Sequence, residues 1–160
     1  MAAAIMENSL HTDGLKEHPL VTQMIYDIGI LLAYKITVEE EYLAALKLSF
    51  DPLASKEIPG PWKGWVAFNA KQLTQAQVNG EIMDHVDTQA QARQIPAYWA
   101  GQVQISLAVD GNLLDLHKHM NLTYRNWLGG MVYGKILSQI DFDPQRGEKL
   151  YEDYLLGRES

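Results

Sequence analysis

The chain has 160 residues, no cysteine and a formal net charge of −7, from 13 basic and 20 acidic residues. This length is typical of one domain, so we expect residues 1–160 to form a single domain, with 1–17 as a loosely ordered N-terminal arm. The lack of cysteine excludes disulfides, iron–sulfur clusters, zinc–thiolate sites and a thiol nucleophile. The negative charge, with Lys and Arg scattered singly along the chain, argues against nucleic acid as a partner.

The N-terminal residues do not resemble a secretory signal, because they lack a basic start and a sustained apolar run. The longest apolar stretch, Met24–Ile36, falls short of the ~20 residues that cross a bilayer. These features predict a cytoplasmic protein with no membrane partner.

The first two predicted elements are helices. A helix is expected to start at His18-Pro19, since proline suits the first helical position. Apolar residues recur there at helical spacing on most sides, which predicts a buried central helix. A second helix is expected from Val38 to about Ser49, preceded by a capping box at Thr37-Val38-Glu39-Glu40.

The middle of the chain favours strands. Prolines and Gly60 mark 51–61 as a loop, and Trp65-Val66-Ala67-Phe68 is a short β-prone run. Asn79-Gly80 is a strong hairpin signal that would pair 73–78 with 81–86. A single helix from Thr74 to Arg93 is the competing interpretation, because this stretch is rich in Gln and Ala.

The clearest predicted hairpin is 103–119. Val103, Ile105, Leu107 and Val109 alternate with Gln102, Gln104, Ser106 and Ala108, and Asp110-Gly111 forms the turn. In that register Ile105, Leu107, Leu114 and Leu116 share the core face.

The chain then returns to helices. Asn121 is the predicted N-cap of a helix over Leu122–Ile140, and an amphipathic helix follows over about Gln145–Leu156. The predicted fold class is therefore α+β: two N-terminal helices, a central antiparallel sheet of four to five strands and two C-terminal helices.

The sharpest chemical pattern is Asp115-x-His117-x-His119. On a strand these three side chains project from one face, where neutral imidazoles can bind a metal ion and Asp115 can ligate or orient them. His85 and Glu81 are candidates for further ligands. The alternative, which we favour, is a solvated sheet face, because an HxH pattern alone is a weak motif.

Aromatic residues form a second pattern. Trp62, Trp65, Tyr98 and Trp99 are candidates for partner binding, because large amphipathic rings anchor many protein interfaces. The alternative is that they pack as a core lid beneath the Pro/Gly loop.

Three functions remain open from the sequence. The first is a small acidic, non-enzymatic interaction protein: an inhibitor, an immunity-type factor or a subunit of an assembly. It has no cofactor, and its partner is a basic protein or a second copy. The alternative is a small metal-dependent hydrolase or metal-binding protein that uses zinc or manganese. A third is a sheet face that binds a small apolar ligand. No catalytic motif is present, so enzymatic activity is uncertain and disfavoured.

Overall fold

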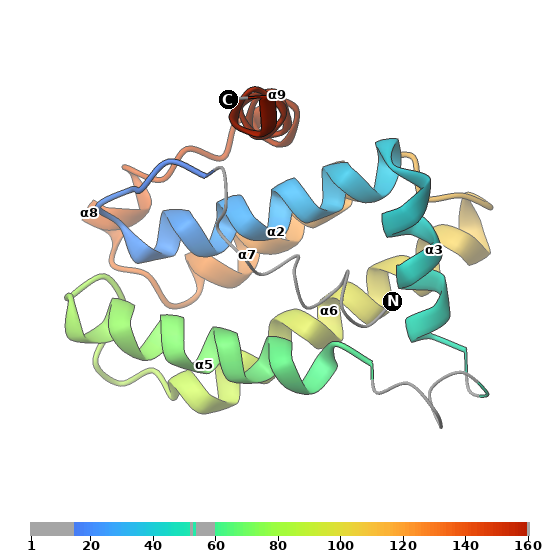
Figure 1. The fold of residues 1–160 in the computed structure, drawn as a ribbon. Coiled ribbons are helices and arrows are strands. Elements are labelled where there is room, and N and C mark those ends of the chain that lie inside the picture. The colour runs from blue at the N-terminus through green and yellow to red at the C-terminus, as the bar shows by residue number, and fades with distance from the viewer. Residues whose placement is uncertain (1–14, 52, 54–59, 160) are drawn as a thin grey trace.

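The computed structural model describes residues 15–51, 53 and 60–159, and throughout these ranges the regular elements are helices (Figure 1). The predicted N-terminal arm and most of the predicted 51–61 loop lie outside the described residues. The helices are α2 (Val21–Val38), α3 (Glu40–Ser49), α5 (Trp62–Val78), α6 (Thr88–Val109), α7 (Leu116–Gly129), α8 (Gly134–Leu137) and α9 (Arg146–Glu159).

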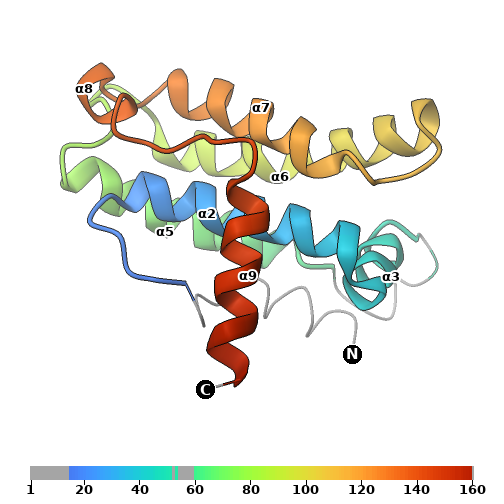
Figure 2. The same cartoon turned by 90° about the horizontal axis from the view of Figure 1, so that it is seen from above.

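Helix α2 forms the centre of the protein. It is buried on nearly all sides, as its all-round apolar pattern predicts. In Figure 1, α5 and α6 lie below α2, and α9 is seen end-on above it. Figure 2 shows that α9 crosses α2, while α7 runs alongside it. The core therefore lies between α2 and the helices packed around it.

Polar side chains of α2 fix the segment that leads into α9. Arg146 of α9 donates to both carboxylate oxygens of Asp27, at 2.5 and 2.6 Å. Gln23 exchanges two hydrogen bonds with the backbone of Asp141. Because Asp27 and Gln23 are buried, these partners satisfy groups that would otherwise be costly inside the core.

The predicted α+β fold is wrong. Within the described ranges the structure contains no strand, and the only β-type pairing there is a single bridge between Ile82 and Val132. The 103–119 hairpin is instead the end of α6, a turn at Asp110-Gly111 and the start of α7. Of the alternating residues Val103 is buried, whereas Ile105 is 60% exposed and Val109 is 75% exposed. A second apolar stripe, facing outward, therefore creates the strand-like alternation.

The other predicted strands are also helical. Residues 65–68 lie inside α5, and the Asn79-Gly80 turn joins α5 to the loop before α6. Neither the 73–86 hairpin nor an unbroken helix over 74–93 forms. Asn79 and Gly80 do form the expected turn, with φ of +77° at Gly80, but it follows a helix.

Three helix boundaries differ from prediction, the first being the start of α2, which lies at Val21 and not at His18-Pro19. The first helix continues through Thr37, whose hydroxyl donates to the Tyr34 carbonyl within that helix, so no capping box forms. Asn121 is not an N-cap but lies inside α7. The predicted single helix is divided, because α7 ends at Gly129 and the short α8 begins at Gly134. The predicted second and last helices are confirmed as α3 and α9.

Among the described residues, α2 alone has the length and apolar composition of a membrane-crossing helix. Most of it (72%) is buried inside the protein, as in a core helix.

Candidate functional site

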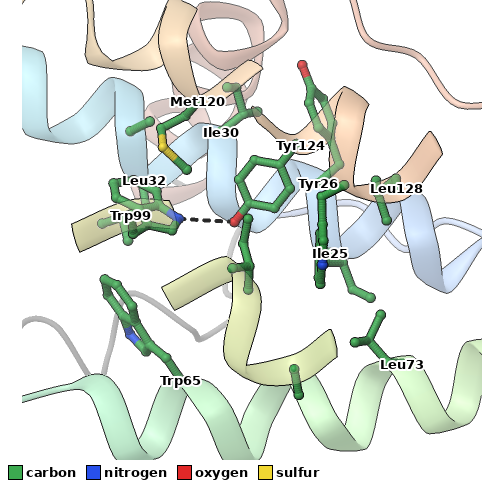
Figure 3. Close-up of a cluster of buried hydrophobic side chains, with 14 of the residues drawn as sticks. Ile25, Tyr26, Ile30, Leu32, Trp65, Leu73, Trp99, Met120, Tyr124 and Leu128 are labelled. Carbon is green, nitrogen blue, oxygen red and sulfur yellow. Dashed lines mark hydrogen bonds between the residues drawn. The ribbon is translucent and has the colours of Figure 1, made fainter. Parts of the chain in front are cut away.

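The interior contains a small cavity between four helices, which we call the aromatic cavity. Its volume is about 20 Å³, which is room for about one water molecule. Several lining side chains appear in Figure 3, where Trp65, Trp99 and Tyr124 converge from three helices. The cavity is lined by Ile25, Ile28, Gly29, Leu32, Trp65, Phe68, Asn69, Ile95, Pro96, Trp99 and Tyr124.

Of the described residues that line this cavity, only Tyr124 of α7 carries a phenol hydroxyl. The indole N–H of Trp99 donates to that hydroxyl at 3.2 Å, the dashed line in Figure 3. Burial raises the pKa of Tyr124, so the phenol stays protonated at neutral pH. Gly29 makes room for it: a Cβ at that position would lie 1.9 Å from the Tyr124 oxygen.

A second buried tyrosine lies next to the cavity. The Asn121 amide donates to the Tyr26 hydroxyl at 2.6 Å and also to the Phe142 carbonyl at 3.1 Å. Burial raises the pKa of Tyr26 to about 12. Its ring meets the Tyr124 and Phe142 rings edge to face. The cavity wall is therefore continuous with a hydrogen-bonded aromatic core.

The lining defines what the cavity can do chemically. Among its described lining residues there is no Asp, Glu, Lys, Arg or His. Tyr124 is the one acid–base group in this described lining, and its raised pKa keeps it protonated. The lining therefore suits contact with a neutral, mainly apolar molecule, for which the cavity would have to widen. The Tyr124 hydroxyl could donate one hydrogen bond to it.

The aromatic residues proposed for partner binding separate into two groups. Trp65 and Trp99 are buried, with their rings 5.8 Å apart, as the core-lid alternative expected. Trp62 is half-buried and contacts Trp65 and Phe50. Tyr98 is 42% exposed on the outer side of α6. Binding of a partner by these residues remains a prediction.

The Asp115, His117 and His119 side chains do not converge, because they lie at the start of a helix and not on a strand. Asp115 pairs with Lys118 at 2.6 Å, and this hydrogen bond lowers the pKa of Asp115. His117 packs edge-on against Tyr34, and burial lowers its pKa. His119 points toward Asp110, 3.8 Å away. The geometry behind the metal hypothesis is absent.

The other proposed ligands are also apart from these residues. Glu81 is buried and caps α2, accepting hydrogen bonds from the backbone N–H groups of Val21 and Thr22 and from the Thr22 hydroxyl. His85 is exposed in the following loop. In the part of the chain that the structure describes, no three His, Asp or Glu residues form a group that could hold a metal ion.

Sequence reasoning missed Gly29 and Glu81 in these roles. A glycine inside an otherwise apolar helix does indicate a close approach, so Gly29 carried a usable signal. The sequence around Glu81 carried no such signal, because its hydrogen-bond donors are 59 and 60 residues away along the chain.

A second notable feature is an apolar face on the outside of α6 and α7, which we call the outer face. It contains Tyr98 and Ile105 of α6 and Leu122 of α7. Ile105 is 60% exposed and Leu122 is 58% exposed. Leu114, in the connecting turn, is 66% exposed. Exposed large apolar side chains on two helices that pack against each other are typical of an interaction surface.

No protein-family model and no curated protein sequence matches this chain. Its fold is similar to two crystal structures of full-length TylP, a TetR regulator from Streptomyces fradiae. The native structure has a TM-score of 0.79 and 23% identity, and the second has 0.78 and 22%. Each comparison covers 99% of this chain and 72% of the TylP chain.

These neighbours contradict three predictions from the sequence. The fold belongs with helical regulators, not with an inhibitor, an immunity-type factor or a metal-dependent hydrolase. The predicted metal binding is likewise not supported. The exclusion of nucleic acid as a partner is contradicted by the same likeness, because TetR regulators bind DNA. The chain therefore has the helical fold seen in TetR regulators.

Proposed function

We propose that this chain is the ligand-binding, self-associating core of a TetR-type transcriptional regulator. Regulators of this type bind DNA and act as dimers, so DNA and a second copy are its proposed partners. The fold likeness over 99% of the chain supports this function. The cytoplasmic location predicted from the sequence is consistent with it.

The observation that carries the proposal is the outer face of α6 and α7. Ile105 and Leu122 are 60% and 58% exposed. Burial of each such side chain is worth about 1.5–3 kcal/mol when complete. A symmetric pair of copies would bury the same patch on both partners, as two-fold interfaces do.

Helix α6 also connects the two proposed functions. Trp99 lines the aromatic cavity, whereas Tyr98 and Ile105 of the same helix belong to the outer face. With about 20 Å³ of free volume, the cavity must widen to admit a ligand. A ligand that displaces Trp99 would thus shift α6 and alter the geometry of self-association, which is the coupling that allostery requires.

Sedimentation velocity over a range of protein concentrations tests this proposal. We expect the wild type to sediment as a dimer and the Ile105→Glu/Leu122→Glu variant as a folded monomer, since buried unpaired carboxylates oppose association. Val78→Glu is the matched control, because Val78 is 77% exposed but lies at the end of α5. A wild type that remains monomeric, or equal loss of dimer in the control, would overturn the proposal.

A further inference from the structure

The surface carries a second hollow, a groove between α5 and α6 that we call the α5/α6 groove. Its volume is about 720 Å³, within the roughly 300–1,000 Å³ of small-molecule sites. Trp62 and Val66 of α5 and Ala97 and Ala100 of α6 supply its apolar surface. Both helices contribute alanines to the lining, Ala67 and Ala70 from α5 beside the two from α6.

The groove is distinct from the outer face. At about 100° per residue, Arg93, Ala97 and Ala100 lie on a side of α6 roughly 120° around the helix from Tyr98 and Ile105. A third side carries Trp99 into the core. Occupation of the groove therefore leaves the self-association surface free.

The charge of the groove differs from that of the chain. Lys63 and Arg93 line it, and its described lining residues include no Asp or Glu. Within the described ranges, neither cation forms an ion pair, whereas Lys118, Arg146 and Lys149 each have a carboxylate partner. In a protein with a net charge of −7, two cations that form no ion pair with any described residue lie beside an apolar groove, and they complement an anion that has an apolar body.

We propose that the α5/α6 groove binds a small amphipathic carboxylate. Its hydrocarbon body packs on Trp62, Val66 and the alanines, and its carboxylate pairs with the guanidinium of Arg93 or the ammonium of Lys63. Along α5 the lining runs from Trp62 to Ala70, which is about 12 Å at ~1.5 Å per residue. A medium-length alkyl chain such as that of decanoate matches this span.

Isothermal titration calorimetry of the full chain with decanoate tests the site. We expect one saturable site in the wild type and at least about tenfold weaker binding in Lys63→Gln/Arg93→Gln, because a charge-assisted hydrogen bond is lost. Decanol should bind the wild type more weakly by a similar factor. Ala97→Trp, which fills the groove at an exposed position, should abolish binding.

Lys71→Gln is the matched control, since Lys71 is an exposed cation of α5 that does not line the groove. It should bind decanoate as the wild type does. Absence of saturable decanoate binding, or unchanged affinity in Lys63→Gln/Arg93→Gln or Ala97→Trp, would overturn the proposal. Sedimentation of the same variants reports the dimer separately, so failure of the groove leaves the proposed regulator function standing.

Discussion

Replacement of Gly29 by alanine is expected to destabilise the fold, against the usual effect of this change in a helix. Gly29 lies inside α2, where alanine normally gains about 1 kcal/mol over glycine. Here, however, the added Cβ would lie 1.9 Å from the Tyr124 oxygen and 2.2 Å from its Cζ. Tyr124 is only 4% exposed, so its ring cannot swing out to solvent without leaving the core.

The magnitude follows from these two opposing contributions. Overpacking of a core costs typically about 1–3 kcal/mol, and displacement of the Tyr124 ring would also break the Trp99 hydrogen bond, worth about 0.5–1.5 kcal/mol. Against a helical gain of about 1 kcal/mol, we expect a net loss of roughly 1–3 kcal/mol in the free energy of unfolding.

Urea unfolding followed by far-ultraviolet circular dichroism measures this, at one fixed protein concentration because self-association contributes to stability. Gly64→Ala in α5 is the control: nothing lies within 4 Å of its added Cβ, so it should stabilise or leave stability unchanged. In a Tyr124→Leu background, Gly29→Ala should no longer destabilise. A stabilising effect of Gly29→Ala in the wild type would refute the reasoning.

Three further predictions concern buried charges. Glu81→Gln should lower the free energy of unfolding by about 1.5–3 kcal/mol, since charge-assisted bonds to the α2 N-terminus weaken. Arg146→Met should cost about 3–5 kcal/mol, because it leaves the buried Asp27 carboxylate without its cationic partner, with only the Gln23 amide still donating to it. Burial lowers the pKa of Lys35 from its ordinary value of 10.5 to about 8. Between these two pH values the Lys35 amine is protonated in the unfolded chain but largely neutral in the folded protein. Lys35 should therefore make stability rise with pH over that window, by about 1–2 kcal/mol from pH 8 to 10.

Each of these has a measurement that can contradict it. Asp84→Asn, an exposed neighbour of Glu81, should be neutral in urea unfolding, and equal losses in both variants would remove the capping argument. A double Asp27→Asn/Arg146→Met variant should recover part of the loss, whereas additive losses would contradict coupling. For Lys35, the difference in unfolding free energy between wild type and Lys35→Met should change from pH 8 to 10; a constant difference would contradict the pKa argument. The raised tyrosine pKa values begin to lower stability as the pH nears about 10, but they do so in both proteins and therefore cancel in this difference.

Several features of this protein follow from local sequence alone. Helix α2 is apolar on nearly every side, so only a central buried position satisfies it, whatever surrounds it. Turns at Asn79-Gly80 and Asp110-Gly111 also form as expected, with φ of +77° at Gly80 and +72° at Gly111. Glycine adopts this conformation without steric cost, so the preference is encoded at the residue itself.

Other features depended on tertiary structure. The alternation over 103–109 satisfies a strand with one buried face and equally a helix with two apolar faces, one toward the core and one outward. Only the packing of α6 against α5 and α7 selects the helix. Likewise, the aromatic cavity joins Gly29 to Tyr124, and the α2 cap joins Val21 to Glu81, across long stretches of chain. Turn geometry is a property of one or two residues, whereas burial is a property of the partners a residue meets, and those partners are brought together only by the fold.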